Sequence, residues 1–128
     1  MLKLLHVAIG GAAGALLRYW ASAAVHRFFS GVFPWGTLFV NLSGSLVIGF
    51  LWGISERIIV PQNIRLCIFI GILGSFTTFS TFTLENFQLL RDGEYVFAFT
   101  NSMLSLVLGM VLVIAGFFFS RFVFNIFR

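Results

Sequence analysis

Charged residues are scarce in this sequence. They make up 9% of its 128 residues, eight Lys or Arg against four Asp or Glu, whereas soluble domains carry about 25%. This shortage excludes an ordinary soluble domain. The formal net charge of +4 comes from single basic side chains near the ends of apolar segments, which argues against a nucleic-acid-binding patch. A lone cysteine, Cys67, excludes an internal disulfide.

Groups for enzymatic chemistry are also few. His6 and His26 have no companion at metal-ligand spacing, and there is no nucleophile–base set or phosphate-binding glycine loop. We therefore do not expect an enzyme. Residues 21–23 imitate a signal-peptide cleavage site after the first apolar run, but Arg18 interrupts that run, so we expect the run to be kept as a membrane span.

Apolar residues dominate instead, at 59% of the chain with 18 phenylalanines, and the mean hydropathy is +1.04. A bilayer crossing takes about 20 apolar residues, and four runs of this size are present. They cover about residues 4–25, 35–54, 64–90, and 95 to 113 or beyond. The sequence thus predicts an all-α membrane protein, a single domain over residues 1–128 with four transmembrane helices.

The third run contains the most unusual segment. Six hydroxyl side chains alternate with phenylalanines over residues 75–83, directly after Gly71 and Gly74. Polar groups without partners are costly in hydrocarbon, so this segment must face protein or water. Glycine and β-branched threonine lower helix propensity, which predicts a helix that breaks within residues 74–78 and resumes toward Leu90. Backbone groups freed by such a break are typical of ion sites.

Polar side chains also lie within the other spans. Arg18 either extends to the lipid headgroups or lines an aqueous vestibule that attracts anions. Asn41, about two turns inside the second span, either bonds a neighbouring helix or donates to an anion. Asn101, Ser105 and Gly109 are spaced four residues apart, which predicts one polar stripe that faces other helices.

Two phenylalanines and one acid of the third span belong to the same region. Phe79 and Phe82 are three residues apart and so share a helix face. Phenyl rings have positive edges that suit a small anion, although plain packing is the alternative. Glu85 continues this face, and it is either a functional membrane-embedded acid or an interfacial one. Along an anion path it should be protonated or turned to hydroxyls.

The basic residues give a modest indication of topology. Four crossings place both termini and the 56–63 loop on one side, with Lys3, Arg57, Arg65, Arg121 and Arg128. The other side has Arg27 and Arg91, with Arg18 nearby. The positive-inside rule mildly favours cytoplasmic termini.

Residues 74–82, Gly-Ser-Phe-Thr-Thr-Phe-Ser-Thr-Phe, together with Gly36-Thr37-Leu38-x-x-Asn41-Leu42 and Arg18, resemble the Fluc/CrcB fluoride channels. The resemblance covers the whole chain. It implies a multi-pass protein of a bacterial or archaeal plasma (inner) membrane that exports fluoride passively. It also implies an antiparallel, dual-topology homodimer in the lipid bilayer, although pairing with an oppositely oriented paralogue stays open.

The same resemblance assigns residues to the site. Its pore residues fall on Asn41, Phe79, Ser80, Thr81, Phe82, Ser105 and Glu85, and its vestibule arginine falls on Arg18. A structural sodium ion would be held at the dimer centre by the backbone carbonyls of Gly74 and Thr77 from both subunits. Some members have a tyrosine at the position of Asn101 and a serine at that of Gly109, which leaves the lining from the fourth span open.

Two other functions remain as alternatives. A small four-helix drug–proton antiporter needs a membrane carboxylate, typically in the first span, where this chain has Arg18 and no acid. A non-transporting membrane assembly subunit would suit the closely spaced glycine pairs Gly10–Gly14 and Gly49–Gly53. It leaves the segment of alternating hydroxyls and phenyl rings unexplained.

Overall fold

The computed structural model describes residues 1–126 and, over these residues, consists of helices and the loops between them. The first two crossings are α1 (Leu2–Phe28) and α2 (Trp35–Ser55). The third comprises α3 (Gln62–Arg65), the π-helical η1 (Leu66–Leu73), α4 (Gly74–Phe76) and α5 (Phe79–Arg91). The fourth comprises α6 (Tyr95–Met103), the π-helical η2 (Leu104–Leu108) and α7 (Gly109–Ile126).

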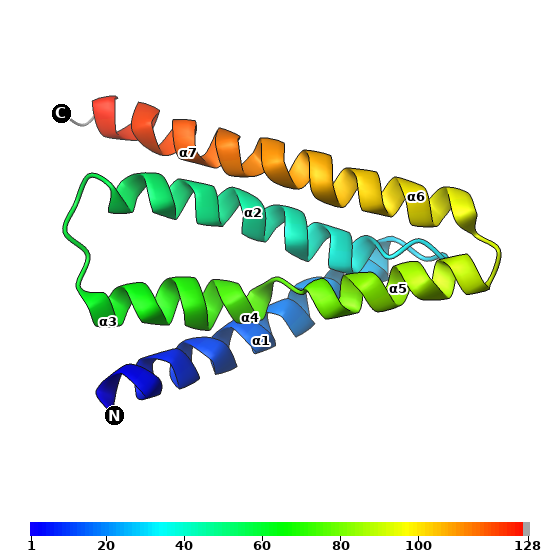
Figure 1. Ribbon diagram of the computed structural model, residues 1–128, viewed down its shortest axis with the longest axis horizontal. Helices are drawn as coiled ribbons and strands as arrows, with labels where there is room; N and C mark the ends of the chain where they lie inside the picture. Colours follow the sequence, from blue (N-terminus) through cyan, green and yellow to red (C-terminus); the bar gives the residue numbers. More distant parts are fainter. Residues whose placement is uncertain (127–128) are drawn as a thin grey trace.

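All four crossings are long and apolar enough to span a bilayer, which confirms the predicted four-helix membrane fold. The fourth extends to Ile126, so the aromatic C-terminal stretch continues the helix. The N-terminus, the end of α7 and the loop between α2 and α3 lie at one end of the molecule, as four crossings require (Figure 1). Arg128, counted above on that side, lies outside the described residues.

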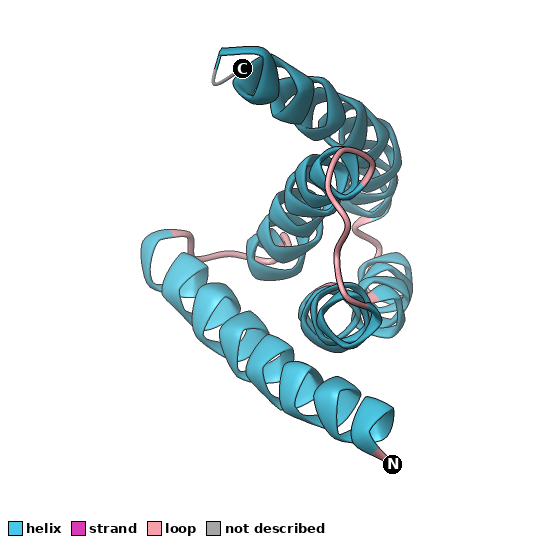
Figure 2. Ribbon diagram, turned by 90° about the vertical axis from the view of Figure 1, so that its left-hand side faces the viewer, coloured by secondary structure: helices cyan, strands magenta, loops and turns pink. Residues whose placement is uncertain are grey.

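The second crossing is central to the arrangement. It lies between the fourth crossing and the third, while α1 passes obliquely across the third (Figure 1). Figure 2 places the N- and C-terminal helices at opposite edges of the molecule. The most extensive contacts join α2 to α7 and α1 to η1.

Glycines set the distance between these paired helices. A Cβ at Gly10 would collide with the carbonyl of Cys67, and one at Gly14 with the carbonyl of Ile72. Gly49 meets the Val113 carbonyl of α7 in the same way. The helix backbones are therefore in direct contact, as the small-residue pairs predicted.

Candidate functional site

The third crossing is broken at two residues, Thr77 and Thr78. Both are extended, with φ −77° and ψ 155° at Thr77 and φ −146° and ψ 122° at Thr78. The break falls inside the predicted interval of residues 74–78. The π-helical segment η1 precedes it, a wider coil that is frequent at functional sites.

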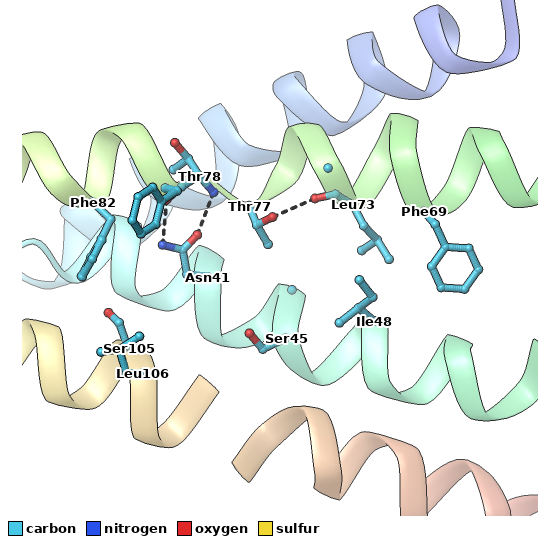
Figure 3. A pocket seen from close by; sticks show the side chains of 13 residues that line it. Asn41, Ser45, Ile48, Phe69, Leu73, Thr77, Thr78, Phe82, Ser105 and Leu106 are labelled. Atoms are coloured by element: carbon cyan, nitrogen blue, oxygen red, sulfur yellow. Dashed lines mark hydrogen bonds between the residues drawn. The ribbon is translucent and has the colours of Figure 1, made fainter. Parts of the chain in front are cut away.

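Asn41 of α2 holds the break in place. Its Nδ2 donates to the Thr78 carbonyl at 3.0 Å, and its Oδ1 accepts from the Thr78 amide at 2.8 Å (Figure 3). The expected helix-bridging role of Asn41 is thereby confirmed. A primary amide has two N–H donors, so one Nδ2 hydrogen is still available for another acceptor.

Thr78 in turn begins the second half of the crossing. Its Oγ1 accepts from the Thr81 amide at 3.3 Å, the usual N-cap interaction, and donates to Thr81 Oγ1 at 3.0 Å. These bonds satisfy backbone and side-chain donors that would otherwise be unpaired at membrane depth.

The same bonds turn two backbone amides away from the carbonyl oxygens of the preceding turn. In a continuous helix the Gly74 and Thr77 carbonyls would accept from the amides of Thr78 and Thr81. Those amides instead donate to the side chains of Asn41 and Thr78. Carbonyl oxygens are ligands that hard cations prefer.

A cavity of about 360 Å³ opens beside the break, between α2, the third crossing and η2. Its polar lining is Asn41, Ser45, Thr77, Thr78 and Ser105, and its apolar lining includes Phe69, Phe79 and Phe82 (Figure 3). Within residues 1–126, Ser105 Oγ is buried and has no hydrogen-bond partner. It is therefore a free donor beside this cavity.

The stripe on the fourth crossing faces inward as predicted. Asn101 is 1% exposed and donates to Asn86 Oδ1 at 3.3 Å, and Gly109 is also buried. Asn101 thus ties α6 to α5, whereas Ser105 alone of the three lines the cavity.

The two phenylalanine rings are neighbours, as their spacing predicted. The Phe79 and Phe82 centroids are 5.9 Å apart and the rings are tilted by 38°. Phe79 is 75% exposed, so most of its ring is uncovered. Offset and tilted aromatic pairs present hydrogen edges as well as faces.

A second polar cavity, of about 440 Å³, contains Arg18 and Thr81. Thr78 lines both cavities, so the break forms the wall between them. Both interpretations of Arg18, vestibule and headgroup contact, stay open. Sequence reasoning missed that Ser22 and His26 line the same cavity, although they follow Arg18 at intervals of four residues.

Two assigned residues lie outside both cavities. Glu85 accepts a hydrogen bond from Thr37 Oγ1 at 2.7 Å through Oε1, so one carboxyl oxygen is turned to a hydroxyl. Its Oε2 is buried and has no partner within the described residues. Ser80 is exposed and lines neither cavity.

Comparison with known proteins identifies the family. The family described as CrcB-like protein, Camphor Resistance (CrcB) matches residues 5–117. Similar relatives include proteins named fluoride-specific ion channel FluC. That of Salinibacter ruber is 45% identical over 116 residues, 91% of this chain and 87% of the relative. That of Phocaeicola vulgatus is 42% identical over 121 residues, 94% of this chain and 100% of the relative. The chain therefore belongs to the CrcB-like family.

Proposed function

We propose that this chain is the subunit of a fluoride-selective channel that exports cytoplasmic fluoride passively across the plasma membrane. One observation carries the proposal: Phe79, Phe82 and Ser105, whose hydroxyl has no partner within residues 1–126, line one cavity at a break in a membrane-spanning helix. The curated relatives named above as fluoride-specific ion channels support the choice of anion.

The donors of this cavity suit passage of a small anion. Ring edges, a hydroxyl and the second Nδ2 hydrogen of Asn41 carry partial charges, so they replace hydration without holding the anion as a full cation would. Conduction needs such weak sites in series. Ser80, Thr81 and Glu85 remain proposed pore residues on the same helix, and Arg18 would concentrate anions at the mouth.

Fluoride export does not need to be coupled to the movement of another ion. A negative membrane potential pushes an anion outward with about 2.3 kcal/mol per charge per 100 mV. Fluoride enters as neutral HF and dissociates in a less acidic cytoplasm, so its gradient is also outward. A passive pathway then suffices for export.

We also propose that the active form is an antiparallel homodimer with a structural sodium ion. The Gly74 and Thr77 carbonyls would hold the ion together with the same pair from a second subunit. Bound there, sodium supplies charge that satisfies these carbonyls. The exposed ring of Phe79 and the exposed Gly74 backbone both leave room for a second subunit at the break.

Efflux from liposomes measured with a fluoride electrode tests the proposed function. We expect rapid fluoride efflux, no comparable chloride efflux, and loss of fluoride efflux in Phe82→Ile. Phe87→Ile is the matched control, because Phe87 is an exposed α5 phenylalanine that does not line the cavity. Equal chloride efflux, or unchanged efflux in Phe82→Ile, would contradict the proposal. Proton-coupled drug uptake would support the antiporter instead.

A further inference from the structure

A polar stripe runs along about the last three turns of α1. Arg18, Ser22 and His26 follow one another at intervals of four residues, and all three line the 440 Å³ cavity. At 1.5 Å per residue the stripe is about 12 Å long. It extends from near the loop end of α1 to the level of Thr78 and Thr81, which line the same cavity.

Gly36 lets this stripe pack against α2. A Cβ at Gly36 would lie 2.8 Å from His26 Nε2 and would collide with Ser22 Oγ. The absence of a side chain therefore brings the imidazole and the hydroxyl onto the α2 backbone, next to Thr37. The stripe is held in place at its outer end by this contact.

His26 lines two cavities, one with a basic residue and one with acidic residues. On α1, Arg18 and Tyr19 line the larger cavity with it, and Arg27 follows it in sequence. From α2, Thr37 lines the larger cavity together with His26. On the third crossing, Glu85 and Gln88 line a smaller cavity of about 210 Å³ with His26, together with Asp92 just beyond α5.

We propose that Arg18, Ser22 and His26 form a capture site for the permeating anion, and that the charge on His26 sets how well this site fills. The inference rests on the proposed fluoride channel. Neutral His26 leaves Arg18 as the only full positive charge among the residues that line the larger cavity. Protonated His26 adds a second positive charge at the outer end and offsets Glu85 and Asp92.

The physical effect follows from Coulomb attraction in a water-filled site. One added charge several ångströms from an anion raises its local concentration by about two- to fourfold at high effective dielectric constant. Histidine changes charge between about pH 5 and pH 8, whereas arginine does not. The fluoride current should therefore rise as the pH falls through this range.

Fluoride currents across planar bilayers test this, because neutral HF carries no current. We would record wild-type channels in symmetric fluoride at about pH 7.5 and about pH 5.5, on either side of the histidine range. We expect a current about two- to fourfold larger at the lower pH. His26→Gln should remove this difference, and His26→Lys should give the larger current at both pH values.

His6→Gln is the matched control, since His6 lies near the other end of α1 and bonds the Leu2 carbonyl. It should keep the wild-type pH response. Glu85→Gln and Asp92→Asn test whether the pH response of the current comes from His26 or from the acids around it. A response that persists in His26→Gln, or vanishes in His6→Gln, would overturn the capture site while leaving the channel intact. Absence of any wild-type fluoride current would instead overturn the proposed function.

Discussion

Asn41 and Thr78 are joined by two hydrogen bonds that pair one side-chain amide with both backbone groups of one residue. Asn41 therefore supplies hydrogen bonds to the backbone where the helix is interrupted. The rest of the site depends on this pair, because it fixes where α5 begins and turns the Thr78 amide away from the preceding turn.

Asn41→Leu should destabilise the subunit and stop fluoride efflux. The change keeps a similar shape but leaves the Thr78 amide without its partner, at a cost of about 1–3 kcal/mol. It also removes the side-chain donor to the Thr78 carbonyl, which as the N-cap carbonyl still accepts the first hydrogen bond of α5. Thermal unfolding in detergent and liposome efflux measure the two effects. Ser43→Ala is the control, because the Ser43 hydroxyl donates to the Val40 carbonyl of its own helix. An unchanged melting temperature in Asn41→Leu would contradict a stabilising role for the hydrogen bonds between Asn41 and Thr78.

Thr37→Val should impair the channel through Glu85. Thr37 is 6% exposed and donates to the Glu85 carboxyl, so valine removes the donor and leaves a carboxyl oxygen without a partner. We expect a stability loss of about 1–3 kcal/mol, measured by thermal or denaturant unfolding. Thr37→Ser keeps the hydroxyl and should behave close to wild type. In a double-mutant cycle, Glu85→Gln should reduce the effect of Thr37→Val; strictly additive effects would argue against this coupling.

Substitutions of Gly49 and Gly74 should have different effects on folding. Gly49→Ala forces a Cβ into the Val113 carbonyl, so it should separate α2 from α7 and lower the yield of folded subunit. In Gly74→Ala the nearest atom to the new Cβ is the Phe69 carbonyl oxygen at 3.6 Å, an ordinary contact. The isolated subunit should therefore tolerate it.

Gly74→Ala then reports on the proposed dimer centre. If a second subunit crosses there, the added methyl group should weaken dimerisation, as seen by crosslinking or size-exclusion chromatography with light scattering, while helicity is retained. A fully dimeric Gly74→Ala protein with wild-type sodium dependence would count against the break as the meeting point of the subunits.

Removing sodium should lower the melting temperature of the purified channel. An ion that binds only the folded dimer stabilises it by about 2.7 kcal/mol at a concentration one hundred times its dissociation constant. We would compare sodium with N-methylglucamine at equal ionic strength. Equal melting temperatures in the two salts would contradict a structural sodium site.

The sequence predicted most of the fold because local signals were strong. Hydropathy located all four crossings, and the glycines and threonines of residues 71–78 located the break. The fourth crossing was harder, since nothing in its aromatic end marks a stop before Ile126. The π-helical segments η1 and η2 have no comparable signal in the sequence.

The site was predicted less completely because its geometry is tertiary. That Asn41 bonds Thr78 depends on how α2 meets the third crossing, which no local pattern specifies. The division of the polar residues between two cavities depends on the same contact. The stripe of Ser22 and His26 with Arg18, in contrast, was present in the four-residue spacing and could have been found.

The bonds between Asn41 and Thr78 also imply an order of assembly during synthesis. Asn41 is made 37 residues before Thr78, so the second crossing precedes the interrupted one out of the ribosome. The unwound peptide finds its partner already placed when it reaches the bilayer, and its bare backbone groups need not face acyl chains. With these two crossings in the reverse order, the Thr78 backbone would enter the bilayer before the Asn41 side chain that bonds it.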